Sequence, residues 1–193
     1  MKKLIITLPL LFVMGLQSCS VLEQAREYER FIACDFSVAA VDIKELAGIS
    51  MADLDGPDDL GIGQMMTITQ RLFSGELPAK IEVGLKATNN NTQKAAITGM
   101  EWKAMLKDEE LFSGYIEGEV VVLPNSATTF PVVASIDLMR LLQSDSFQEI
   151  GGFIFSPDKK AALRKIGATL KIKPYYKVGD NIQKYPGYLT IEP

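Results

Sequence analysis

The sequence contains no histidine and only two cysteines, Cys19 and Cys34. Without histidine, serine–histidine catalysis and histidine-ligated metal sites are excluded, and two cysteines cannot form a disulfide framework. The 193 residues are 47% hydrophobic and 23% charged, with a net charge of −4. This composition excludes a disordered or collagen-like chain and fits one compact domain. An acidic chain also lacks the basic surface of a nucleic-acid-binding protein, so no nucleic-acid partner is expected.

Residues 1–18 are predicted to be a secretory signal peptide. Two lysines precede an apolar run, residues 4–16, which is too short to span a bilayer permanently. The run ends in Leu-Gln-Ser-Cys at Cys19, which resembles the lipobox of bacterial lipoproteins. This resemblance implies that Cys19 is acylated and holds the mature chain on a membrane, and Ser20 after it points to the outer membrane. A plain signal peptide that happens to contain a cysteine, or an uncleaved anchor, is the alternative.

The chain after the expected cleavage site divides into a short N-terminal segment and one domain. Without the first 18 residues it carries 18 basic and 24 acidic side chains, a net charge of −6. Residues 19–33 are predicted to form a lipid-anchored tether or short helix, because charged residues recur there at helical spacing. Residues 34–193 are predicted to form the folded domain.

Apolar residues alternate with polar ones over most of this domain, which is the period of a strand with one buried face. Residues 81–88 show the pattern most clearly, and residues 107–110 are predicted to be a polar turn within a hairpin. The alternation predicts about seven strands, near residues 36–43, 81–88, 100–106, 112–122, 130–136, 168–173 and 189–191.

Helices are expected at two insertions, near residues 64–74 and 138–166. In the second, Ser156-Pro157-Asp158 is predicted to cap a helix that Gly167 ends. Antiparallel strands at short spacing without βαβ alternation predict an all-β fold, an immunoglobulin/fibronectin type III-like antiparallel β-sandwich.

Four stretches of the strand region form a recognisable pattern, residues 81–91, 97–106, 111–114 and 122–126. Together they resemble the late-embryogenesis-abundant type 2 domain, also called the water-stress and hypersensitive-response domain. The resemblance is clearest over residues 79–138 and departs at Asn90, where the family usually has proline, and in the insertion 138–166. It implies a fibronectin-like sandwich with a stress-protective, binding or structural role and no catalytic residues.

Three groups of acidic residues are candidates for functional sites. Residues 53–59 offer carboxylates for calcium, but Gln64 stands where an EF-hand needs a bidentate glutamate, so a solvated loop is favoured. Glu109 and Glu110 could act as paired catalytic acids, and so could Glu117 and Glu119. The first pair is expected in a turn and the second on an exposed strand face, where solvated carboxylates are ordinary. No catalytic residue, metal or cofactor is predicted.

A ligand surface is a further hypothesis for the C-terminal residues, where tyrosines gather among lysines. Such a surface would stack sugars or hold an anionic glycan, although aromatic residues on strands more often pack across a sheet. The residues of this surface are Tyr175, Tyr176, Tyr185, Tyr188, Lys171 and Lys173. The Asn-x-Thr sequence contained in residues Asn89 to Thr92 is interpreted as a turn rather than a glycosylation site.

Two functions stay open at this point. The first is a non-catalytic envelope lipoprotein whose sandwich binds another envelope protein or has a structural or protective role. The second is a surface lipoprotein that captures a glycan and works with a transporter, which an exposed coplanar array of the tyrosines would favour. Independently of this choice, Cys34 is predicted to be a buried free thiol and Trp102 a core residue.

Overall fold

The computed structural model describes residues 21–106, 109–142 and 152–193. The expected signal peptide, the lipidation site Cys19 and part of the second helical insertion, residues 143–151, lie outside the described residues. Within the described ranges, no helix has both the length and the apolar character needed to cross a bilayer.

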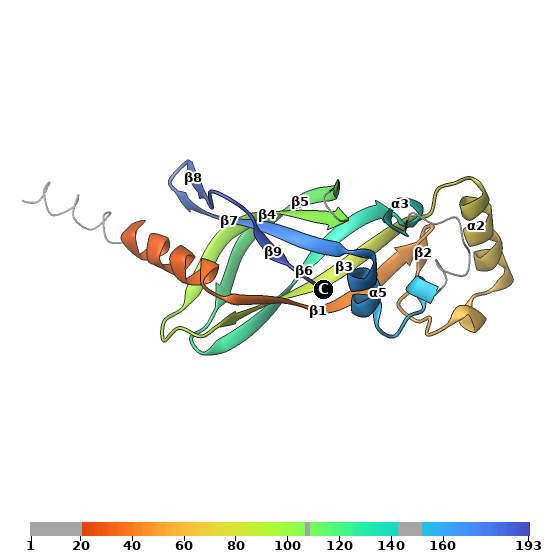
Figure 1. The fold of residues 1–193 in the computed structure, drawn as a ribbon, viewed down its shortest axis with the longest axis horizontal. Coiled ribbons are helices and arrows are strands. Elements are labelled where there is room, and N and C mark those ends of the chain that lie inside the picture. The colour runs from red at the N-terminus through yellow and green to blue at the C-terminus, as the bar shows by residue number, and fades with distance from the viewer. Residues whose placement is uncertain (1–20, 107–108, 143–151) are drawn as a thin grey trace, which may run out of the picture.

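The fold consists mainly of two antiparallel sheets (Figure 1). One sheet has the strand order β2-β1-β3-β6 and the other β5-β4-β7-β8, with β9 also paired to β7. The prediction of a mostly β fold with short helices is therefore confirmed, while the immunoglobulin/fibronectin type III-like subclass stays a prediction. The strands are β1 (Asp35–Leu46), β2 (Ile49–Ser50), β3 (Pro78–Asn89), β4 (Ala95–Leu106), β5 (Glu109–Val122), β6 (Ser126–Asp137), β7 (Ala168–Val178), β8 (Asn181–Lys184) and β9 (Leu189–Ile191).

Short helices lie mainly at one end of the sheets, and the helix of residues 21–32 lies at the other end (Figure 1). The helix predicted near residues 64–74 is confirmed as α2. The predicted cap of α5 is wrong in detail, because Asp158, not Ser156, is the N-cap and accepts a hydrogen bond from the amide of Ala161. Gly167 ends the helix as predicted, with a φ of 78°. The other helices with defined bounds are η1 (Pro57–Asp59), α2 (Ile62–Phe73), α3 (Leu138–Leu142) and α5 (Lys159–Ile166).

The core lies between the two sheets and draws on both. Leu85 of β3, Met100 of β4 and Ile172 of β7 are completely buried. In β1 the buried residues do not follow the predicted alternation along the whole strand. A register shift between Val38 and Ala40 inserts one residue, so the positions after it point to the opposite face of the sheet. Val38 points inward, but beyond the shift the buried residues are Val41 and Ile43 rather than Ala40.

The β4–β5 hairpin begins its second strand earlier than the sequence predicts. Glu109 and Glu110, assigned to the turn, are the first two residues of β5 and pair with β4. The prediction for Trp102 is confirmed, since its side chain is 4% exposed and belongs to the core. Its ring covers Gly114 on the neighbouring strand, where an added Cβ would lie 2.6 Å from Cζ2 of the indole.

The helix of residues 21–32 packs onto the end of the sandwich. Phe31 is completely buried and Tyr28 is 8% exposed, and both belong to the same core as the sheets. The Tyr28 hydroxyl donates to the carbonyl of Pro174, at 3.4 Å. The buried carboxylate of Glu27 is paired with Lys94 at 2.9 Å. The first helix is therefore fixed to the folded body.

Cys34 follows this helix as a buried free thiol, as predicted. Burial, with a smaller contribution from Asp35, raises its pKa to about 11, from a model-compound value of 9.0. Because the unfolded thiol ionises at lower pH than the folded one, its contribution to stability is present below pH 9.0 and is lost as pH rises toward about 11.

We therefore expect slow modification of native Cys34 by a thiol reagent at pH 7, and a stability that falls between pH 9 and 10.5. Urea unfolding of the parent protein and of Cys34→Ala across this pH range would measure the loss of stability. The free energy of unfolding should fall less in the variant. The pKa of Tyr28, raised by burial to about 12, contributes mainly above this window. Rapid labelling of the native protein would contradict the assignment.

Candidate functional site

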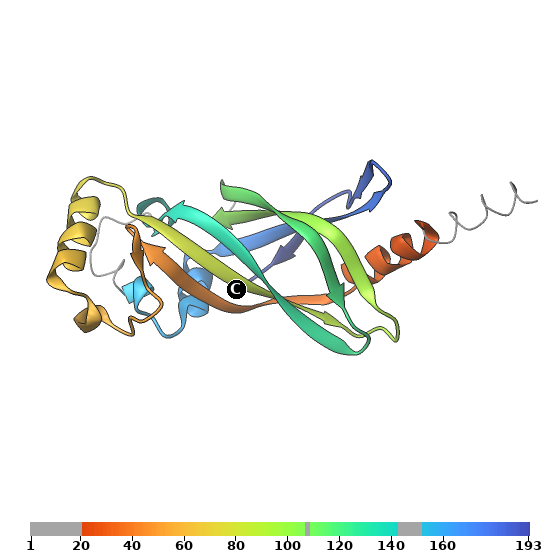
Figure 2. The same ribbon diagram turned by 180° about the vertical axis from the view of Figure 1, so that it is seen from behind.

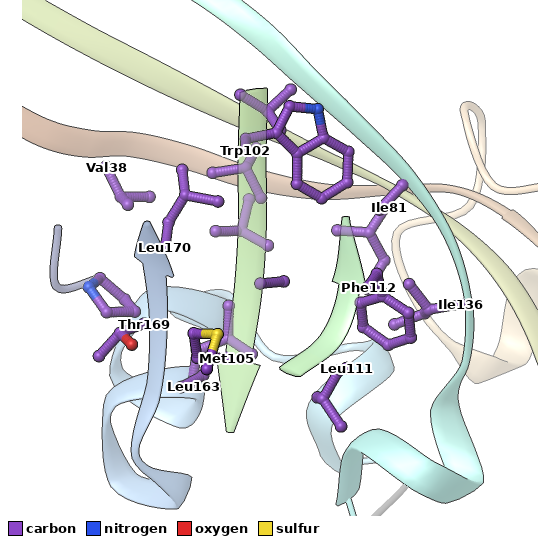
Figure 3. A pocket seen from close by; sticks show the side chains of 17 residues that line it. Val38, Ile81, Trp102, Met105, Leu111, Phe112, Ile136, Leu163, Thr169 and Leu170 are labelled. Atoms are coloured by element: carbon purple, nitrogen blue, oxygen red, sulfur yellow. The ribbon is translucent and has the colours of Figure 1, made fainter. Parts of the chain in front are cut away.

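The two sheets enclose an apolar pocket near the end that carries α5 (Figure 3). Its cavity volume is about 80 Å³. Strands of both sheets contribute side chains that converge on this space, and α5 adds Leu163. The lining residues are Val38, Val41, Ile81, Val83, Trp102, Ala104, Met105, Leu111, Phe112, Val132, Ala134, Ile136, Leu163, Ala168, Thr169, Leu170 and Pro193.

The pocket exists because β5 and β6 are end strands of different sheets. They follow one another through a turn (Figure 2), and near it the Thr128 hydroxyl donates to the carbonyl of Val121 at 3.1 Å. Away from this turn, Leu111 and Phe112 of β5 and Ala134 of β6 line the pocket and are only partly buried. The space between the sheets is therefore accessible along these two edges.

The chemistry of the wall favours an uncharged apolar ligand. Among the described residues that line it there is no charged side chain, and Thr169 provides the one hydroxyl. A water molecule inside a protein needs two to four polar partners, which this wall does not offer. An apolar group can instead occupy such a space without losing hydrogen bonds.

The predicted C-terminal ligand surface is divided between two faces of the sheet. Tyr175 points outward with Lys171 and Lys173, because residues at spacings of two share a face. Tyr188 lies on this outer face too, with its ring centroid 5.0 Å from the Lys173 ammonium group. Tyr175 is only 7% exposed, since its ring lies across Gly99 on β4, where an added Cβ would be 2.6 Å from Cζ.

The other two tyrosines of that hypothesis lie elsewhere. Tyr176 contacts Tyr28 of the first helix, with ring centroids 4.8 Å apart, and Tyr185 packs against the core. The structure therefore places Tyr188 next to Lys173, on the same face as Tyr175 and Lys171, but the four tyrosines do not form one exposed coplanar array.

Two of the acidic candidates, Glu110 and Asp59, make local contacts, while Glu117 and Glu119 are exposed as expected. Glu110 is paired with Lys103, and this hydrogen bond lowers the pKa of its carboxyl group. In the loop of residues 53–59, the Asp59 carboxylate accepts from the amides of Asp55 and Gly56, at 2.9 and 3.0 Å. Nowhere in the described ranges do three or more potential ligand side chains gather in a way that could hold a metal ion.

The Asn-x-Thr sequence, Asn90-Asn91-Thr92, lies in the connection between β3 and β4, as predicted, and Asn89 just before it is completely buried. The Asn89 amide group donates to the carbonyls of Gln93, Val122 and Leu123, at 2.9, 3.1 and 3.2 Å. Its oxygen accepts from the backbone and the side chain of Asn91, both at 3.0 Å. Asn89 thus joins the β3–β4 turn to the β5–β6 turn.

Comparisons with known proteins do not assign a family. No protein-family model matches the chain, and no significant match is found among curated proteins. A crystal structure of a protein from Archaeoglobus fulgidus is similar at 17% identity and a TM-score of 0.33, over 60% of this chain and 82% of that one.

Two further solved structures are similar at comparable levels. A protein described as ApaA from Bordetella pertussis has 9% identity and a TM-score of 0.34, over 82% of this chain and 94% of that one. The solution structure of AT1g01470 from Arabidopsis thaliana has 12% identity and a TM-score of 0.33, over 82% and 80%. At these scores none of the three carries a functional argument.

No local pattern in the sequence marks the apolar pocket. Its residues come from six strands, helix α5 and Pro193 after the last strand, and all except Thr169 are ordinary apolar residues. One weak signal is the small side chain at Ala104, Ala134 and Ala168, where a larger residue would fill the space. These alanines line a cavity because β5 and β6 belong to different sheets and do not pair with each other.

Proposed function

We propose that this protein is a non-catalytic envelope lipoprotein whose β-sandwich is a binding module for an apolar ligand. The observation that carries the proposal is the pocket between the sheets, whose wall is apolar and contains Trp102. Lipid on Cys19 would hold the module at a bacterial membrane, most simply the outer membrane. The finer fold class, a fibronectin type III-like sandwich related to late-embryogenesis-abundant type 2 domains, is part of the same proposal.

The first helix packs onto the folded domain, which supports the proposal that the domain is held close to the lipid on Cys19. The helix is fixed to the sandwich through Phe31 and Tyr28, and Ser20 alone separates its first described residue from Cys19. A short connection of this kind would keep the two sheets at the membrane surface, with the pocket toward the end of the sheets that lies away from the first helix (Figure 1). Two or three acyl chains are sufficient for stable attachment.

Glycan capture with a transporter stays the alternative function. It would use Tyr188 and the neighbouring lysines, but the burial of Tyr175 and the placement of Tyr176 on the other face reduce the stacking area. A purely structural or protective role also remains compatible with the fold. The apolar pocket supports ligand binding more directly than either.

We predict that the mature protein begins at Cys19 and carries acyl chains. Intact-mass spectrometry of protein from the native membrane fraction would show this, and the Cys19→Ala variant should not become lipidated. A mature chain that begins elsewhere, or that has no acyl mass, would overturn the proposed anchor.

Ligand binding can be measured through Trp102, the one tryptophan of the chain, because it lines the pocket. We expect at least one of two brominated apolar probes, bromobenzene and 8-bromo-1-octanol, to quench its fluorescence saturably. Iodide, which cannot enter an apolar site, should quench weakly. If neither brominated probe shows saturable quenching, the binding function is wrong.

A further inference from the structure

One helix at the end of the molecule presents apolar side chains to solvent. α2 lies at the end opposite the first helix (Figure 1), and none of its residues is buried. Ile68 and Leu72 are partly buried and pack against the core. Ile62, Met65 and Met66 are instead 82%, 50% and 68% exposed. The fold therefore uses one side of α2 and leaves other apolar side chains of the helix exposed.

Most of these exposed side chains belong to one row along the helix. Ile62, Met66, Thr69 and Phe73 recur at spacings of four, three and four residues, and all four are exposed. Residues at these spacings share one face of an α-helix, because a turn contains 3.6 residues. A mostly apolar row of this kind is what a helix offers to a second helix. Single exposed apolar residues are ordinary on a protein surface, whereas several on one face of one element indicate a partner.

The charges beside this row are negative. Four exposed aspartates precede α2, in the loop and in the 3-10 helix η1, namely Asp53, Asp55, Asp58 and Asp59. Arg71, in the last turn, is the single charged residue within the sequence of α2. The row begins three residues after η1, so its first turn lies next to these carboxylates. A partner that covers the row should therefore carry positive charge at its edge.

Two other occupants fit this arrangement poorly. An amphipathic helix that lies on a membrane usually carries lysine and arginine on its polar face, and anionic lipids would repel the aspartates. α2 also lies at the end away from the first helix, which the proposed lipid would hold at the membrane (Figure 1). A two-fold contact of α2 with α2 in a second copy would bring two identical acidic loops together. The chain as a whole is acidic, which adds to the repulsion between copies.

We infer that the exposed face of α2 binds an amphipathic helix of a partner protein, one that carries lysines or arginines beside its own apolar row. Methionine side chains are flexible and adapt to the shape of an apolar partner, which suits Met65 and Met66 to this role. The aspartates would attract the basic side chains and speed the encounter. α2 contributes no residue to the described wall of the pocket, so this inference is independent of the proposed ligand binding.

The test uses a labelled peptide of about eighteen residues, long enough to form a helix, with leucines at spacings of three and four residues and lysines elsewhere. The mature protein is reconstituted in phosphatidylcholine vesicles, and the peptide that sediments with them is measured against empty vesicles. We expect saturable binding that weakens at least tenfold between about 50 and 500 mM salt, because salt screens exposed charges. The same peptide with glutamate in place of lysine should bind at least tenfold more weakly.

Two neighbouring substitutions on α2 form a matched pair. Met66→Lys puts a charge into the row and should weaken binding of the lysine peptide at least tenfold. Thr67→Lys adds the same charge one residue later, about 100° around the helix, and should change the affinity less than threefold. Both sites are exposed, so both variants should unfold in urea like the parent protein. Asp55→Asn combined with Asp58→Asn should weaken binding about three- to tenfold and reduce its salt dependence.

The remaining outcomes would overturn the inference. Absence of saturable binding, equal affinity for the two peptides, or equal effects of Met66→Lys and Thr67→Lys would show that this face does not recognise a basic helix. A dimer of the parent protein that Met66→Lys abolishes would assign the face to a second copy. Binding of the Cys19→Ala chain to phosphatidylglycerol vesicles, if Met66→Lys abolished it, would assign the face to a membrane.

Discussion

Replacing Trp102 by alanine should lower the free energy of unfolding by about 3–5 kcal/mol, the usual cost of removing a large buried aromatic side chain. The indole is 4% exposed and sits between Gly114 of β5 and Ile172 of β7 in the register of the sheet. Its removal would enlarge the existing pocket rather than allow the sheets to close, because both flanking strands are held by their backbone pairing. Urea unfolding followed by circular dichroism measures the change.

The close approach of the indole to Gly114 gives this prediction an internal control. A methyl group at Gly114 would collide with the ring, so Gly114→Ala should destabilise the parent protein. In the Trp102→Ala background the collision is absent, and the same change should cost much less. A double-mutant cycle would show this coupling. Additive effects, or a folded-state fluorescence maximum at the fully exposed wavelength with strong iodide quenching, would show that the ring does not occupy this site.

The period-two pattern predicts most of the strands because each has one buried and one exposed face. Beyond a point where a strand carries an extra residue, the pattern assigns the buried and exposed residues to the wrong faces. In β1 the register shift after Val38 makes Ala40 exposed and Val41 buried, and nothing in the local composition marks it. The start of β5 is missed for a related reason, since Glu109 and Glu110 are polar residues held in the strand by pairing with β4.

The functional residues are harder to predict, because they depend on which sheet edges meet. Tyr175 and Tyr176 are adjacent in sequence, yet one covers Gly99 on the outer face and the other contacts the first helix. The pocket requires β5 and β6 to diverge, a property of the whole sandwich that no single strand encodes. Local patterns therefore predict the elements, while the site follows from their assembly.

The buried Asn89 should be the most sensitive polar position of the fold. Asn89→Ala should destabilise the protein by about 2–4 kcal/mol, because one buried and two partly buried backbone carbonyls lose their donor together. Two of these, on Val122 and Leu123, belong to the β5–β6 connection, so the loss would loosen the corner that joins the two sheets. Asn89→Asp should cost at least as much, since a carboxylate would face the same carbonyl oxygens without donating to them.

The neighbouring asparagine is the matched control. Asn90 is exposed and donates to the Asp35 carboxylate at 2.7 Å, so Asn90→Ala should change stability by less than about 1 kcal/mol. Urea unfolding of the three variants, with hydrogen exchange at the amides of residues 121–128, would measure both the global loss and its location. Equal stabilities of Asn89→Ala and Asn90→Ala would contradict the role of Asn89. Faster exchange at the corner in Asn89→Ala would connect this one side chain to the separation of β5 from β6, and hence to the width of the pocket.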